Sequence, residues 1–163
     1  MLLTKEGIIE RALVDKYISD LQFQPCGVDL SLCEVRSLES RGCIDFDNSE
    51  RELSKTKVIE FSGDGWVHLK KGAYKVVYNE IVDIPEDCAG LAYPRSSLLR
   101  CGAFLHCAVW DPGYRGRSES LLVVVNDEGI RLKRNARLVQ MVFIKLEKKA
   151  KSLYSGKYKG ENL

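Results

Sequence analysis

The feature that most constrains the fold is a series of short β-branched or alternating apolar stretches, separated by Gly, Asp, Asn and Pro. Such stretches are typical of strands, and the separating residues are typical of turns. So many short strands predict a mainly β domain built as a barrel or jelly roll. The expected strands are 27–35, 57–61, 73–77, 81–84, 104–109, 121–125, 129–133 and 138–146.

Two segments interrupt this pattern with helical features. Thr4 can cap a short helix to about residue 13, because apolar residues follow it at helical spacing. The segment SSLLRCG (96–102) is leucine-rich and unbranched, which favours one helical turn that presents the Ser96 and Ser97 amides near a helix start. The polar region 38–56 predicts a surface loop.

Composition limits the classes of function. The 163 residues, 45% of them hydrophobic, suit one domain spanning 1–163. A formal net charge of +2 lies far from the basic balance of a duplex-binding protein, so we expect no specific nucleic-acid partner. Lys5 and Glu6 interrupt the apolar N-terminus and no apolar run could span a bilayer, so we expect a cytoplasmic protein with no membrane partner and with reduced cysteines.

The clearest chemical signal is RSSLLRCG at 95–102, followed by DPGYRG at 111–116. Arginine provides forked donors that match phosphate oxygens, and serine hydroxyls add short neutral donors. A carboxylate placed beyond them can orient a water molecule or hold Mg²⁺. The pattern therefore indicates attack on a nucleotide. Taken alone, the arginines could be surface residues and Asp111 an ordinary turn residue.

Further motifs make the pattern more specific. QPCGVDL, RSSLLRCG, WDPGYRG, a strand ending at Asn126, RNARLVQMVF and YSGKYKG follow one another in order. Together they resemble the dCTP deaminase/dUTPase superfamily, most closely its archaeal-type dUTPase branch, from about residue 20 to the C-terminus. The resemblance implies a dUTPase-like distorted β-barrel (β-clip) with short helices. It also implies a homotrimer with sites at subunit interfaces, and hydrolysis of dUTP to dUMP and pyrophosphate.

The resemblance assigns roles to individual residues. Asp111 would orient the attacking water near the sugar and the α-phosphate, and the backbone of 105–109 would read the pyrimidine. Asp29 would reach the shell of Mg²⁺ through water, which suits a cation that dehydrates reluctantly; alternatively it is an acid at a strand end. The residues expected to neutralise phosphate charge are Arg95, Ser96, Ser97, Arg100 and Gln140. A polar network in the core is the competing account of Gln140.

The C-terminal segment 147–163 contains few large apolar residues and is expected to be a mobile lid. By resemblance, Tyr154 would stack on or hydrogen bond to the nucleotide, and Lys157 and Lys159 would meet the phosphates. A solvated basic terminus is the alternative. The tail also lacks the glycine-rich form found in classical trimeric dUTPases.

The alternative reaction is dCTP deamination, alone or combined with dUTP hydrolysis. Deaminases of this superfamily carry a catalytic glutamate three positions before the strand-ending asparagine. Counting back from Asn126 reaches Val123, and counting forward from Gly116 reaches Leu121, so neither can transfer protons. Glu119 could substitute if the two extra hairpin residues were absorbed after it. We therefore favour dUTP hydrolysis.

A non-enzymatic alternative is a β-barrel module that binds nucleic acid through its lysine-rich tail. Such a module should gather aromatic stacking residues on one strand face. The candidate residues are scattered along the chain instead: Tyr74, Tyr78, Tyr93 and Trp110.

Overall fold

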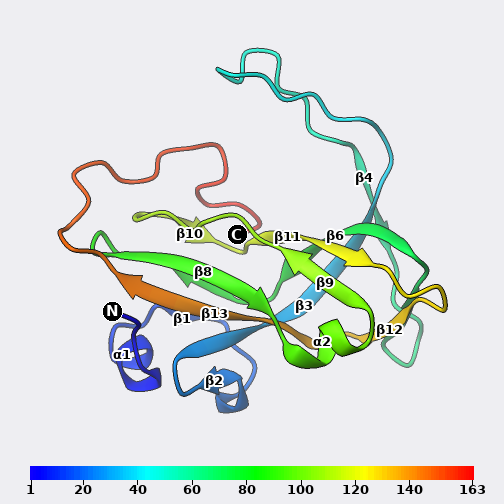
Figure 1. Cartoon of the computed structure of the whole chain (residues 1–163), viewed down its shortest axis with the longest axis horizontal. Coiled ribbons are helices and arrows are strands. Elements are labelled where there is room, and N and C mark those ends of the chain that lie inside the picture. Colours follow the sequence, from blue (N-terminus) through cyan, green and yellow to red (C-terminus); the bar gives the residue numbers. More distant parts are fainter.

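The longest strand, β3 (Gly27–Leu38), lies inside the main sheet of this computed structural model, which describes residues 1–163. The strand order is β8-β13-β3-β6-β11-β9, and β2 and β4 also pair with β3. The two end strands, β8 and β9, pack against each other, so the sheet curls into a nearly closed barrel (Figure 1). The remaining elements of this sheet are β2 (Phe23–Gln24), β4 (Thr56–Ile59), β6 (Gly72–Tyr78), β8 (Cys88–Pro94), β9 (Ala103–His106), β11 (Glu119–Val124) and β13 (Arg137–Lys145).

Two small sheets and three short helical segments complete the fold. One small sheet has the order β1-β7-β10 and the other pairs β12 with β5. The mainly β architecture confirms the prediction from the strand pattern. The bounds are α1 (Lys5–Glu10), β1 (Val14–Asp15), the 3₁₀ turn η1 (Asp20–Gln22), β5 (Trp66–Leu69), β7 (Ile81–Asp83), α2 (Ser96–Arg100), β10 (Arg115–Gly116) and β12 (Ile130–Lys133).

The core lies inside the barrel. Alternate residues of β3, namely Val28, Leu30 and Leu32, are fully buried, because successive side chains of a strand point to opposite faces. Asp29 and Ser31 occupy the other face of β3 and are also buried, so polar groups are packed outside the apolar core.

An irregularity in β13 aligns the residues of that polar face. Arg137 pairs with Ser31 and Val139 with Leu30, so Leu138 is an extra residue in the ladder. Leu138 and Val139 are both buried as a result. A bulge of this kind changes which face the following side chains occupy. It puts Arg137 on the same face of the sheet as Gln140.

The local predictions held with limited corrections. The helix capped by Thr4 ends at Glu10 rather than near residue 13, because Ala12 adopts a positive φ of 50°. The helical turn expected in 96–102 is α2. The pattern missed β8, whose sequence CAGLAYP contains no β-branched residue, and it also missed β5. All six cysteines are free.

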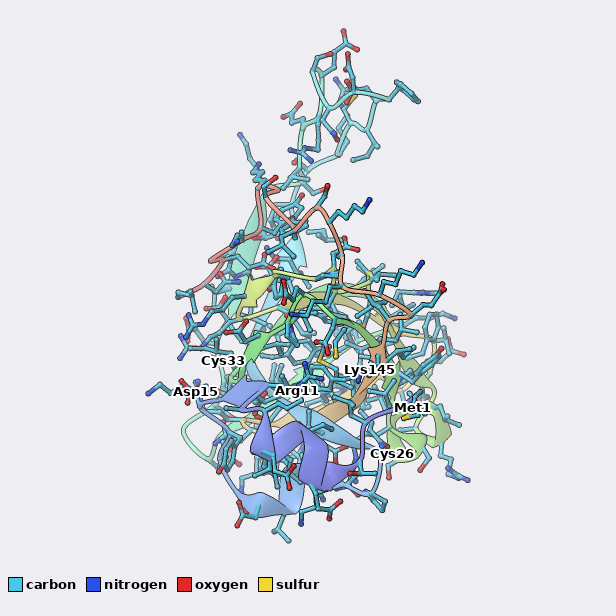
Figure 2. All side chains as sticks on the ribbon, turned by 90° about the vertical axis from the view of Figure 1, so that its left-hand side faces the viewer. Met1, Arg11, Asp15, Cys26, Cys33 and Lys145 are labelled. Carbon is cyan, nitrogen blue, oxygen red and sulfur yellow. The ribbon has the colours of Figure 1, made fainter.

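Two segments extend from the barrel or wrap around it. The expected loop at 38–56 forms an arm that projects away from the body (Figure 1 and Figure 2), and the base of the arm approaches the C-terminal tail, where the guanidinium of Arg51 lies 6.0 Å from the centre of the Tyr158 ring. Phe46 in this arm is fully exposed. The C-terminal tail runs back across the molecule to β10 and β11 (Figure 1). None of the helices is long and apolar enough to cross a membrane.

Candidate functional site

A polar cleft lies across three neighbouring strands. Tyr93 of β8 is directly opposite Gln140 of β13, which is directly opposite Asp29 of β3. Directly opposed residues share a face of the sheet, so the three side chains form one row. The row lines a cleft of about 540 Å³, here called the arginine cleft, which also includes Cys26, Arg95 and Ser96.

Asp29 is the most buried group of the cleft, with 1% of its surface exposed. Its Oδ2 atom lies 3.0 Å from Nε of Arg95 and accepts a hydrogen bond of 3.2 Å from Nη1 of Arg137. Its Oδ1 atom is buried and has no hydrogen-bond partner. Burial raises the pKa of the Asp29 carboxyl, and the charges of Arg95 and Arg137 counter part of that rise.

The predicted phosphate-binding segment divides into two groups. Arg95 and Ser96 line the arginine cleft together with Gln140. Ser97 and Arg100 are exposed on α2 and do not line that cleft. Nη1 of Arg100 donates to the backbone oxygen of Ser96 at 2.9 Å, so its guanidinium supports the helical turn in this conformation.

Asp111 lies in a different hollow. This Asp111 pocket has a volume of about 280 Å³ and is lined by Trp110, Tyr114, Glu119 and Tyr154, among others. An apolar groove of about 370 Å³ adjoins both hollows. It shares Tyr93 and Pro94 of β8 with the arginine cleft, and the loop 108–109 with the Asp111 pocket. The three hollows are therefore neighbours that share walls.

The tail residues lie beside Asp111 and away from the arginine cleft. The backbone of Tyr154 donates to Pro112 at 2.7 Å, and its ring packs edge-on against Tyr114. Lys157 and Lys159 are exposed and line none of the three hollows. The tail is thus docked against the turn that carries Asp111, and its role as a lid over phosphates stays a prediction.

Glu119 occupies the Asp111 pocket but its carboxylate is engaged. Oε2 pairs with Nζ of Lys75 at 2.8 Å, and Oε1 accepts from Nδ2 of Asn162 at 3.2 Å. Val123 and Leu121 follow it in β11, paired with Ala73 and Lys75 of β6. In this arrangement Glu119 is tied to the barrel and to the tail.

Sequence reasoning missed Arg137, which does not line the cleft itself but donates to Oδ2 of Asp29 from a neighbouring hollow. In an unbroken strand, residues 137 and 140 would face opposite sides of the sheet. Only the bulge at Leu138 brings both to the face of Asp29. The motif RNARLVQMVF contained this arginine, but strand alternation alone gave no reason to place it there.

The residues present fit a magnesium ion in one way only. No group of three or more His, Cys, Asp or Glu side chains is arranged to hold a metal. Oδ2 of Asp29 is engaged by two arginines, and Oδ1 is a buried acceptor without a hydrogen-bond partner. Asp29 is the one carboxylate that lines the cleft, so a metal there would draw most of its ligands from water and from the bound polyphosphate.

The aromatic residues do not form a stacking surface. Tyr78 and Trp110 are buried in the core, and Tyr74 is half-buried against it, which leaves Tyr93 as the exposed ring of the four. A nucleic-acid module that stacks successive bases needs several exposed rings on one face. The structure therefore disfavours the non-enzymatic alternative.

Comparisons with known proteins agree on the family. Residues 3–146 match the family model described as dCTP deaminase-like. A protein of Methanosarcina mazei named probable deoxyuridine 5'-triphosphate nucleotidohydrolase is 54% identical over 144 residues, which are 88% of this chain and 84% of that protein. A protein of Archaeoglobus fulgidus with the same name is 49% identical over 162 residues, 99% of this chain and 92% of that protein.

A third relative and one solved structure extend the comparison. The protein of Methanocaldococcus jannaschii named deoxyuridine 5'-triphosphate nucleotidohydrolase is 42% identical, covering 88% of this chain and 90% of that protein. The crystal structure of the 2'-deoxycytidine 5'-triphosphate deaminase of Agrobacterium tumefaciens matches with a TM-score of 0.66 at 20% identity. That match covers 87% of this chain and 48% of the other, and it shows a shared fold.

Proposed function

The chain belongs to the dCTP deaminase-like family, and we propose that it hydrolyses dUTP to dUMP and pyrophosphate. The observation that carries the proposal is the identity of 42–54%, over most of the chain, to archaeal proteins named for this reaction. The grouping of Arg95, Ser96 and Gln140 in one cleft supports it, because these are donors suited to phosphate oxygens.

In this proposal water attacks the α-phosphorus, the bond to the bridging oxygen of the β-phosphate breaks, and pyrophosphate leaves. Asp111 orients the water and accepts its proton, while Arg95, Ser96 and Gln140 bind the phosphates. The backbone of residues 105–109, which line the apolar groove, reads the pyrimidine base. Catalysis of this kind depends on positioning and on electrostatic stabilisation.

We include Mg²⁺ in the proposal as a cation that enters with the triphosphate and offsets its charge. Oδ1 of Asp29 supports this, because it is a buried acceptor that no group of the chain satisfies, and a metal-bound water that reached it would do so. Chelation by EDTA should then abolish turnover, and added Mg²⁺ should restore it. Full activity in EDTA would remove the metal from the proposal.

We also propose a homotrimer. Large apolar side chains of β8, of the loop after β9 and of β11 and its end are exposed in the single chain, which supports burial against other copies. These side chains are Tyr93, Val109, Leu121 and Val125. Light scattering coupled to size exclusion should give three times the chain mass of 18.4 kDa. A monomer at micromolar concentration would contradict this state.

The deciding experiment separates the two reactions of the family. Pure protein is incubated with dUTP or with dCTP in Mg²⁺, and products are resolved by chromatography. Hydrolysis predicts dUMP and pyrophosphate from dUTP. The deaminase alternative is favoured by one observation, the place of Glu119 beside Asp111. Conversion of dCTP to dUTP, with dUTP left intact, would replace the proposal with that alternative.

A further inference from the structure

Two arginines share a single oxygen of the buried Asp29. Arg137 approaches from one side and is itself fixed, because its Nη1 also donates to the backbone oxygen of Leu21 at 2.7 Å. Arg95 approaches from the other side through Nε. The backbone oxygen of Asp29 in turn accepts from the buried Gln22. The position of the Asp29 carboxylate is thus fixed by contacts with the barrel that do not involve Arg95.

The geometry of Arg95 leaves its terminal nitrogens available. Nε forms an ion pair with Oδ2 of Asp29 at 3.0 Å, and Nη1 and Nη2 lie further from that oxygen and contact no other acceptor of the chain within hydrogen-bond distance. These two nitrogens carry the paired donors that fit phosphate oxygens. Arg100 differs, because its Nη1 donates a hydrogen bond to the backbone oxygen of Ser96 and its side chain is exposed. Arg95 is therefore the arginine that the fold has oriented in the cleft.

We propose that Asp29 is a positioning residue for Arg95, and that Arg137 anchors Asp29 for this purpose. Asp29 holds the guanidinium of Arg95 through Nε, so that both terminal nitrogens are already oriented toward the polyphosphate. Less side-chain entropy is then lost when the polyphosphate binds. This assignment rests on the proposed function, and it differs from a role confined to the magnesium shell. Binding of the phosphates then depends on Asp29 even when no metal is present.

The two roles predict opposite signs for one measurement. If Asp29 acts only on Mg²⁺, removing its negative charge leaves metal-free binding of a polyanion unchanged or makes it tighter. If Asp29 positions Arg95, the same change weakens metal-free binding, because the arginine loses its orientation. A contact between a guanidinium and an anion of this kind is worth about tenfold or more in affinity.

The experiment measures the Kd of inorganic tripolyphosphate and of dUTP in EDTA by calorimetry. The variants are Asp29→Asn, Arg95→Ala and the double variant. We expect Asp29→Asn and Arg95→Ala each to weaken binding about tenfold or more, and the double variant to bind no worse than Arg95→Ala. The control Asp127→Asn removes the same charge from an exposed pair with Lys71 and should bind as the wild type does.

Arg95→Lys provides a second test, which remains informative even if Asp29→Asn does not fold. Arg95 is partly exposed, and lysine keeps the charge but lacks Nε and the fork. Positioning predicts that Arg95→Lys weakens binding nearly as much as Arg95→Ala, whereas wild-type affinity in this variant would overturn the proposal. Unchanged or tighter metal-free binding by a folded Asp29→Asn would also overturn it. Failure of the wild type to hydrolyse dUTP, with tripolyphosphate binding lost in Asp29→Asn, would reject the proposed function alone.

Discussion

The Asp111 carboxylate projects from a turn whose backbone is fixed at several points. Tyr114 N donates to the oxygen of Asp111 at 3.1 Å, and Gly113 N donates to Ile84 at 2.7 Å. Gly113 has a φ of 86°, and a Cβ there would lie 2.8 Å from the side chain of Leu153. The turn is therefore held between the small sheet and the tail, while the carboxylate itself is exposed and forms no hydrogen bond. This arrangement leaves both oxygens free to accept from a water.

Asp111→Asn keeps the shape of the side chain and removes its charge and basicity. Because the carboxylate takes no part in packing, we expect the melting temperature to stay within about 2 °C of the wild type. Turnover should fall by about a hundredfold or more, as is usual when a proton acceptor is lost. Pyrophosphate release and thermal melting measure the two effects. Nearly normal turnover would reduce Asp111 to a turn residue.

Glu80 is a buried carboxylate whose hydrogen-bond partners are all neutral. Its oxygens accept from Ser31 N at 2.8 Å, Ser31 Oγ at 2.5 Å and Gln22 Nε2 at 2.7 Å. Burial raises the pKa of Glu80 above its ordinary value of 4.5, and these hydrogen bonds oppose the rise. The folded protein therefore binds this proton more readily than the unfolded chain does. The contribution of Glu80 to the unfolding free energy falls as pH rises from about 4.5 through the raised pKa.

Glu80→Gln should remove that part of the pH dependence, because an amide does not titrate. Urea unfolding at several pH values above 4.5 would measure the unfolding free energy of both proteins. We expect the unfolding free energy of the wild type to fall relative to that of the variant as pH rises from about 4.5 through the raised pKa of Glu80, and the difference to level off above that pKa. Glu60→Gln, at an exposed glutamate, is the control and should keep the wild-type slope. Parallel curves for wild type and Glu80→Gln would contradict the argument.

At the scale of elements, the helical turn α2 depends on Gly102, the glycine that follows its C-cap Cys101. Gly102 has a φ of 72°, and its backbone oxygen accepts from both Val125 and Asn126 after β11. A Cβ at Gly102 would lie 2.9 Å from Cβ of Asn126. The end of α2 is thus packed directly against the neighbouring strand, which fixes Arg95 and Ser96 relative to the barrel.

Gly102→Ala should destabilise the protein by about 1–3 kcal/mol, because alanine is strained at positive φ and its methyl group meets Asn126. Urea unfolding measures the change. Gly63→Ala is the matched control, since a Cβ there meets nothing within 4 Å and its φ is not positive, and it should leave the free energy within about 0.5 kcal/mol. A loss of equal size in both variants would show that α2 does not depend on this position.

The elements also show what the sequence could predict. Strands rich in β-branched residues and the turn α2 follow from local preference, and most of the polar cleft follows from motifs. Strand β8 does not, because Gly90 and Ala92 are poor strand formers and pairing with β13 decides their conformation. A Cβ at Gly90 would lie 2.3 Å from Cε of Met141, so this glycine is required by packing that no local pattern reveals.

For the whole molecule, the tail acts as a strap across the turn that bears Asp111. Glu161 accepts at its backbone from Arg117 N at 3.0 Å, and its carboxylate accepts from the hydroxyl of Tyr114 at 2.7 Å. Gly160 N donates to Arg115 at 2.7 Å. These contacts involve β10 and the residues on either side of it, and the rings of Tyr154 and Tyr158 pack against the edge of the core. The hydrogen bonds of the strap are thus concentrated on the segment that carries Asp111, and its apolar contribution to the core is limited to these two rings.

Deleting residues 154–163 should lower turnover at least about tenfold, because the Asp111 turn loses its support and the site loses cover from water. The melting temperature should fall far less, since only two half-buried rings of the deleted segment, Tyr154 and Tyr158, pack against the core. Lys157→Ala distinguishes a tail that only supports the Asp111 turn from a tail that also closes over the nucleotide. Lys157 is exposed in this structure, so its side chain can contact a phosphate only if the tail moves toward the nucleotide. A weaker dUTP affinity in Lys157→Ala would indicate closure, and an unchanged affinity would leave the tail as a strap. A truncated protein that hydrolyses dUTP at the full rate, or one that does not fold, would contradict both roles.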